Sequence, residues 1–163
     1  MRYHDYDIAD HHKDYVGLAY LHLASRAPRR QRRILANRLL DTGLFSHLTE
    51  HALMHLASEA HEFSYPSHWT VLAAGNVPDL ALLLLGGSAT YSADGQPVGS
   101  AGPGTIVGLM EAIEGRPTRM SLISDVPLCG VAIDPQILSR ALQPAIDVAA
   151  RSTGSTLQPA PAH

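Results

Sequence analysis

Hydrophobic residues recur at three- and four-residue intervals over the first third of the chain, which is the spacing of an amphipathic helix. Pro28 suits the first turn of a helix, and Thr42-Gly43 suits a helix end. The pattern therefore predicts three helices, over residues 11–25, 28–42 and 49–60. The third helix carries one apolar stripe, which consists of Leu53, Leu56, Ala57 and Ala60.

The pattern changes after His61, where short apolar runs alternate with turn residues every eight to twelve positions. This spacing predicts about eight short strands in a compact antiparallel sandwich or barrel. Asp94-Gly95 between two of the runs favours a two-residue hairpin turn. A last helix is predicted over residues 135–151, so the fold class is α+β. The clearest runs are residues 69–74, 80–85, 88–93, 98–101, 119–123 and 128–133.

The composition is that of one folded domain. The 163 residues are 45% apolar and 17% charged, which is enough apolar surface to form a core. The longest apolar run, residues 80–85, is far shorter than the ~18 residues of a membrane span. The start of the chain has no secretory signal pattern, and the single cysteine, Cys129, cannot form an internal disulfide. We therefore expect a cytoplasmic protein without a membrane span.

The net charge of -3 is unevenly distributed. Residues 26–38 contain six arginines and no acidic residue, whereas the rest of the chain is acidic. No helix-turn-helix pattern surrounds this basic stretch, so we expect no specific DNA binding. The stretch favours contact with an acidic protein partner or a neighbouring subunit, and nonspecific contact with nucleic acid or anionic lipid is the alternative.

Glycines mark the ends of several predicted strands, where positive φ or close backbone approach is needed. The set consists of Gly75, Gly87, Pro103-Gly104 and Gly108, preceded by Leu44-Phe45-Ser46-His47-Leu48. In this order it resembles the cyclic nucleotide-binding domain, the sensor module of catabolite activator and fumarate-nitrate regulators and of protein kinase A regulatory subunits. The resemblance covers residues 39–145. It implies an antiparallel β-roll flanked by helices, with a regulatory role.

In that family, a short helix after the last glycine of this set holds the ligand phosphate. A glutamate directly after the glycine accepts the ribose hydroxyl, and an arginine ten or eleven residues later pairs with the phosphate. Leu109 stands at the glutamate position and cannot accept a hydrogen bond. Arg119 lies at the arginine spacing. The resemblance thus implies a degenerate ligand site of Gly108, Leu109, Met110, Arg119 and Met120.

The ligand implied by this degenerate site is not cyclic AMP bound in the usual way. A different cyclic nucleotide, a cyclic dinucleotide, another small anion and no ligand at all remain open. No nucleophile elbow or phosphate loop occurs in the sequence, so we expect no enzymatic activity. Cys129 lies in an apolar run and is expected to be buried rather than reactive.

Histidines suggest a further, weaker interpretation. His51, His55 and Glu59 recur every four residues, on a helix face that points away from the apolar stripe. A solvated polar face explains this spacing, and a metal site is the alternative. His4, His11 and His12 could also gather around a metal or a haem.

The chain is expected to divide into an N-terminal helical extension (1–43), a β-roll domain with its C-terminal helix (44–151) and a disordered tail (152–163). The leading hypothesis is a regulatory or sensor protein that signals through protein contacts. The N-terminal helices would bind the partner or a second copy. A scaffold with a purely structural roll is the alternative, and a metal or haem sensor is the weaker one. Because about 12 residues follow the last helix, we expect no attached DNA-reading domain.

Overall fold

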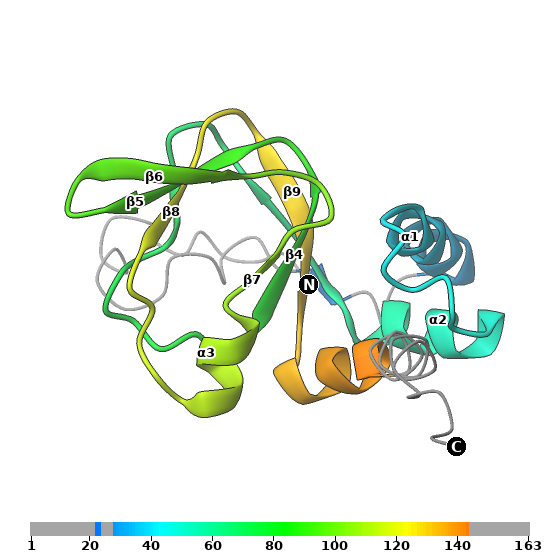
Figure 1. The fold of residues 1–163 in the computed structure, drawn as a ribbon. Helices are drawn as coiled ribbons and strands as arrows, with labels where there is room; N and C mark the ends of the chain where they lie inside the picture. Colours follow the sequence, from blue (N-terminus) through cyan, green and yellow to red (C-terminus); the bar gives the residue numbers. More distant parts are fainter. Residues whose placement is uncertain (1–21, 24–27, 144–163) are drawn as a thin grey trace, which may run out of the picture.

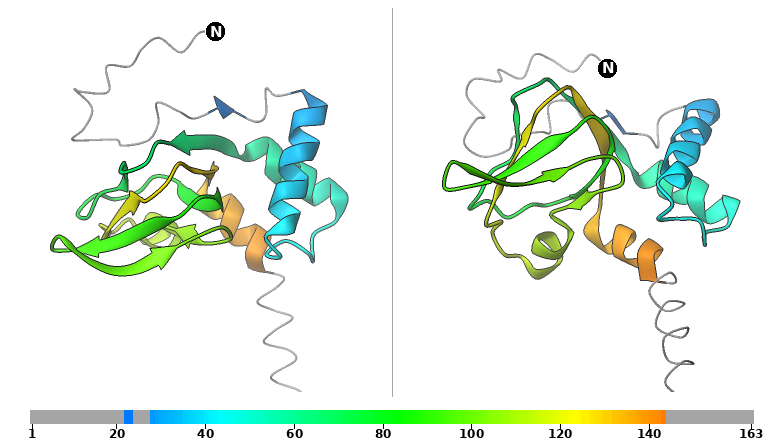
Figure 2. Two further views of the ribbon diagram at one scale, coloured as in Figure 1. Left: turned by 90° about the horizontal axis from the view of Figure 1, so that it is seen from above. Right: turned by 45° about the horizontal axis from the view of Figure 1, so that its top comes forward.

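The computed structural model describes residues 22–23 and 28–143. Two antiparallel sheets form a roll, and α1, α2 and the helical residues 135–143 gather on one side of it (Figure 1). The further views in Figure 2 keep α1 and α2 on that same side. The predicted α+β architecture, an antiparallel β-roll with flanking helices, is confirmed. No helix in residues 22–23 and 28–143 is both long and apolar enough to span a membrane.

The helices predicted after Pro28 and Thr49 are confirmed. Thr49 caps the second of them, because its hydroxyl oxygen accepts a hydrogen bond from the Ala52 N–H at 3.2 Å. Residues 135–143 are helical, and residues 144–151 of that predicted helix lie outside the described residues, as does the tail 152–163. The labelled helices are α1 (Arg29–Asp41), α2 (Glu50–Glu59) and α3 (Leu109–Glu114).

The helix predicted over residues 11–25 is wrong at its described positions. His22–Leu23 form strand β1, which pairs antiparallel with Glu62 and His61. Backbone pairing with a sheet edge takes precedence there over the helical spacing of the side chains. The remainder of that prediction falls outside the described residues.

All pairings in both sheets are antiparallel. The first sheet has the order β1-β2-β9-β4-β7 and the second has the order β3-β8-β5-β6. Each of the six apolar runs overlaps a strand, and Asp94 and Gly95 have φ of 51° and 76°, as the predicted hairpin requires. The strands after β1 are β2 (His61–Tyr65), β3 (Thr70–Leu72), β4 (Ala81–Gly86), β5 (Ala89–Ala93), β6 (Gln96–Ala101), β7 (Ile106–Val107), β8 (Ser121–Ser124) and β9 (Leu128–Ile133).

The buried side chains form two clusters, one on each face of the first sheet. The roll cluster fills the space between the two sheets and includes Leu84 and Leu122. The helix-side cluster joins the outer face of the first sheet to the helices and includes Leu39 and Leu83. The predicted stripe of α2 belongs to this second cluster, because Leu53, Leu56, Ala57 and Ala60 are all buried. The helices therefore pack on the outer face of the first sheet, and the roll keeps a separate core between its two sheets.

A close approach of two loops explains the glycine before β5. Gly87 has φ of +86°, and a Cβ there would collide with the carbonyl oxygen of Pro127. Both the backbone conformation and the lack of space therefore favour glycine, which is one of the positions that carry the resemblance.

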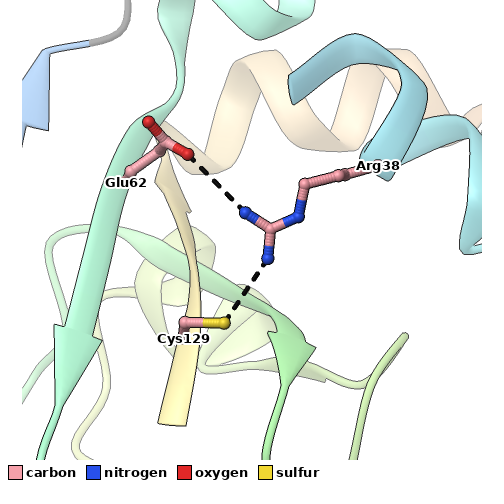
Figure 3. Close-up of polar contacts among 3 residues, drawn as sticks. All are labelled: Arg38, Glu62 and Cys129. Atoms are coloured by element: carbon pink, nitrogen blue, oxygen red, sulfur yellow. Dashed lines mark hydrogen bonds and ion pairs between the residues drawn. The ribbon is translucent and has the colours of Figure 1, made fainter. Parts of the chain in front are cut away.

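Arg38 ties α1 to two strands of the first sheet (Figure 3). One guanidinium nitrogen lies 3.7 Å from the Glu62 carboxylate on β2, and another donates to the Cys129 sulfur on β9 at 3.4 Å. The prediction that Cys129 is buried is wrong, since the residue is half-buried and its sulfur lies beside the partly exposed side chain of Arg38. Arg38 thus joins α1 to both β2 and β9.

The helical residues 135–143 are anchored at their start and near their end. The Asp134 carboxylate accepts hydrogen bonds from the N–H groups of Gln136 and Ile137. The His47 ring nitrogen Nε2 lies 2.7 Å from the Ala141 carbonyl oxygen. Because His47 belongs to the connection between α1 and α2, this hydrogen bond joins the last described helix to the helix pair.

Candidate functional site

The candidate site begins where β7 leads into α3. Gly108 immediately precedes α3 and has φ of +76°, a left-handed conformation that favours glycine. A Cβ at this position would lie 3.3 Å from Pro78 Cγ, which is a tight contact. The sequence signal at Gly108 therefore reflects a backbone requirement at the start of α3.

Leu109 follows Gly108 and is half-buried against the helix-side cluster. Its side chain contributes to the core at the position where the resembling family has a ribose acceptor. Met110 and Met120 are different, because their side chains are 52% and 40% exposed. Both methionines thus offer apolar surface near the two ends of the Gly108–Arg119 segment.

Arg119 is exposed and forms no ion pair with any residue that the structure describes. The other arginine of this segment, Arg116, pairs with the neighbouring Glu114 carboxylate. That hydrogen bond and the negative charge of Glu114 raise the pKa of Arg116 above its ordinary value. Among the described residues of the segment, Arg119 is therefore the cation left to meet an external anion.

The loop between β3 and β4 contacts both ends of the candidate site. At one end Pro78 packs beside Gly108. At the other end Thr118 is buried, and its hydroxyl donates to the Ala73 carbonyl at 2.9 Å. Backbone hydrogen bonds from Gly75 N–H to Thr118 O (2.8 Å) and from Thr118 N–H to Asn76 O (3.0 Å) complete the attachment. The residue directly before Arg119 is therefore held firmly.

Glu111 is a further acidic group near the site. Burial raises the pKa of Tyr91 on β5, and the negative charge of Glu111 raises it further. Glu111 therefore lies within electrostatic reach of the roll strand β5. The sequence analysis gives no role to Tyr91 or to Thr118, because their contacts join residues that are far apart in the chain.

The histidines on α2 lie where the helical spacing placed them. His51, His55 and Glu59 are all exposed, on the face opposite the buried stripe. Within the part of the chain that the structure describes, no three His, Cys, Asp or Glu side chains come close enough to hold a metal ion. His4, His11 and His12 lie outside the described residues.

Neither a family model nor a curated protein sequence matches the chain. Solved structures do match it. A putative cyclic nucleotide-binding protein from Geobacter metallireducens is similar at a TM-score of 0.57 and 24% identity, over 72% of this chain and 96% of that one. A cyclic nucleotide-binding domain from Methylobacillus flagellatus is similar at a TM-score of 0.58 and 22% identity, over 71% of this chain and 67% of that one.

A kinase subunit shows the same likeness. The regulatory subunit of a cAMP-independent protein kinase A from Trypanosoma brucei is similar at a TM-score of 0.64 and 19% identity, over 80% of this chain and 47% of that one. The chain thus spans about half the length of that subunit. Together with the helix after Gly108 and the two-sheet roll, these matches show that the chain has the fold of a cyclic nucleotide-binding domain.

Proposed function

We propose that this protein is a non-catalytic regulatory sensor that binds a small anionic ligand between Gly108 and Arg119 and passes the signal on through protein contacts. The observation that supports it best is Arg119, an exposed arginine without an ion pair among the described residues, in a domain with this fold. The guanidinium of Arg119 follows a firmly held residue and suits a phosphate group, since its N–H groups form a fork that matches phosphate oxygens.

The ligand is a cyclic nucleotide or cyclic dinucleotide recognised mainly through its phosphate. Leu109 provides no hydrogen-bond acceptor for a ribose hydroxyl, which argues against the usual mode of cyclic AMP binding. The exposed side chains of Met110 and Met120 provide apolar surface for the flat faces of a base. Solved structures of similar fold differ in ligand, because one kinase subunit is described with cAMP and another, from Trypanosoma cruzi, with guanosine.

In this proposal, ligand binding to the roll is transmitted to a partner through α1, α2 and the helical residues 135–143. The helical residues 135–143 pack on the helix-side cluster, and the His47 hydrogen bond to Ala141 links them to the α1–α2 connection. Leu109, at the start of α3, packs on the same cluster. A ligand that shifts α3 would therefore act on the packing of the helices, where a partner protein or a second copy binds. In this scheme residues 1–43 serve as the contact extension and residues 44–151 as the sensor.

Titration calorimetry of the full chain against cyclic AMP, cyclic GMP and cyclic dinucleotides tests the proposal. We expect heat with at least one of them and a loss of affinity of about tenfold or more in Arg119→Gln, because a hydrogen bond to a charged group contributes roughly 1.5–3 kcal/mol. Arg140→Gln is the matched control, since Arg140 is also exposed but lies in the helical segment 135–143. No heat with any nucleotide, or equal affinity in Arg119→Gln and the unchanged protein, contradicts the sensor function.

A second candidate is a scaffold in which the roll is only structural and the helices bind. The arginines of α1 favour it, because four of them have no ion pair among the described residues. In that case no nucleotide binds, while partner binding through α1 persists. A metal or haem sensor is the weaker candidate, and elemental analysis with an absorbance spectrum of the purified protein tests it.

A further inference from the structure

The first half of α1 carries a dense and unpaired positive charge. Arg38, near the end of the helix, pairs with Glu62. The four arginines at the start of α1 form no ion pair with any residue in the described ranges, and they are Arg29, Arg30, Arg32 and Arg33. The helix holds five arginines against Asp41, whereas the other described residues hold three arginines and nine carboxylates. The charge of the domain is thus strongly polarised toward one helix.

A groove of about 740 Å³ lies between this helix and α2. Arg29 and Arg32 line it from α1. The α2 side consists of Thr49, Glu50, His51, Met54, His55 and Ser58. The groove therefore combines two cationic side chains with polar groups and the half-buried Met54.

Arg32 is held in place within this groove. Its Nε atom is inaccessible to water and has no hydrogen-bond partner among the described residues, although the whole side chain is half-buried. The stem is thus packed against its neighbours, which leaves less rotational freedom to lose on binding. Such a side chain is better prepared to bind an anion than a freely moving surface arginine.

We infer that the groove between α1 and α2 docks an acidic segment of a partner protein, with carboxylates of that segment bound by Arg29 and Arg32. Arginine binds carboxylates through two parallel hydrogen bonds, and arginine and methionine are enriched at protein interfaces. Met54, which also lines the groove, offers an apolar contact. The inference deepens the protein-contact part of the proposed function by naming the chemistry of the partner. It does not depend on a nucleotide ligand.

The charge distribution favours a short acidic segment over a nucleic acid. A nucleic acid is bound along a track of cations that neutralise successive phosphates. Outside α1, most of the charged side chains that the structure describes are carboxylates, and Glu50 lines the groove itself. A long polyanion would therefore meet several carboxylates outside α1, whereas a short acidic segment in the groove would meet only Glu50 among the carboxylates of its described lining.

The groove is also separate from the candidate ligand site. Figure 1 and Figure 2 show α3 beneath the roll and apart from α1 and α2. Variants of the groove and variants of Arg119 can therefore be tested separately in the full chain.

Fluorescence anisotropy with a labelled glutamate-rich peptide tests the inference on the full chain at about 0.15 M salt. We expect Arg29→Gln/Arg32→Gln to weaken peptide binding about tenfold, which corresponds to about 1.4 kcal/mol. Arg116→Gln/Arg140→Gln removes the same net charge elsewhere and should leave binding within about twofold, since surface charges away from the contact contribute little. Because Arg32 is half-buried, Arg29→Gln alone serves as a second variant, with a smaller loss expected in the same direction.

Three outcomes would overturn the inference. Equal weakening in the groove variant and the control would assign the binding to overall charge. Tighter binding of a single-stranded oligonucleotide than of the peptide would assign the groove to nucleic acid. Sedimentation that shows self-association, abolished by Arg29→Gln/Arg32→Gln, would assign it to a second copy. Nucleotide titration of the groove variant keeps the two proposals distinguishable, because its nucleotide affinity should equal that of the unchanged protein.

Discussion

The two sheets of the roll differ in how many of their faces are covered. In the first sheet, Leu83 of β4 packs on the helix-side cluster while Leu84, the next residue, packs in the roll cluster. In the second sheet, β6 exposes five of its six residues, including Val98 at 56%. The helices therefore pack on the outer face of the first sheet, whereas the second sheet is covered only on its inner face, which packs against the first sheet. If ligand binding alters the packing of the roll, we expect the helices to be affected through the first sheet, because that sheet contacts them.

Leu83→Ala should produce the largest loss of stability that this difference predicts. Leu83 has no exposed surface and lies between β4 and the helices, so the substitution leaves a cavity and costs roughly 2–5 kcal/mol. Val98→Ala on β6 is the matched control, expected to change the free energy of unfolding by no more than about 0.5 kcal/mol. Urea unfolding followed by circular dichroism measures both. Similar losses in the two variants would mean that the two sheets are covered to the same extent.

The number of covered faces also explains which strands could be predicted from the sequence. Residues 80–85 and 128–133 form nearly continuous apolar runs because the strands β4 and β9 within them are buried on both faces. Strand β2 alternates, with Phe63 and Tyr65 buried among polar neighbours, and none of the predicted apolar runs includes it. Strand β1 consists of two residues fixed by pairing with β2, which no local pattern contains. Burial on both faces is therefore the property that sequence reasoning detects best.

The features of the candidate site also fall into two groups, those that are local in the sequence and those that depend on the whole fold. The positive φ of Gly108 could be predicted because a glycine at a strand end is a local feature of the sequence, and Arg119 was singled out by its spacing from Gly108 in the resembling family. The packing of Leu109 on the helix-side cluster and the hydrogen bond from Thr118 to Ala73 could not. They join segments brought together by the whole fold, 45 residues apart in the case of Thr118. The ligand role of Gly108, Leu109, Met110, Arg119 and Met120 stays a prediction.

Two tyrosines, one on each sheet, allow the two sheets to be compared through the pH dependence of stability. Tyr65 on the first sheet is 3% exposed, and burial raises its pKa above the ordinary value of 10.0. The unfolded chain then loses the phenol proton before the folded chain does, so stability is full below pH 10 and falls above it. The loss is at most about 1.4 kcal/mol per pH unit for one group. Tyr65→Phe should remove this alkaline loss in urea unfolding measured between pH 9 and about 11.

Tyr91 on the second sheet provides the matched variant. It is half-buried, and burial and the charge of Glu111 raise its pKa, so the direction of the effect is the same. Because solvent reaches this side chain, Tyr91→Phe should remove a smaller part of the alkaline loss than Tyr65→Phe. A larger effect of Tyr91→Phe would mean that the inner face of the second sheet is the more tightly packed of the two.

The smallest expected effect concerns the ion pair between Arg38 on α1 and Glu62 on β2. The two side chains are 40% and 43% exposed and their charged atoms are 3.7 Å apart, so solvent screens the attraction. A double-mutant cycle with Arg38→Gln and Glu62→Gln should give a coupling energy of about 0.2–1 kcal/mol that decreases with added salt. Cys129→Ala in the same background measures the second contact of Arg38. A coupling energy near that of a buried pair, several kcal/mol, would show that α1 is held on the first sheet by this charge and not chiefly by the packing of Leu35 and Leu39.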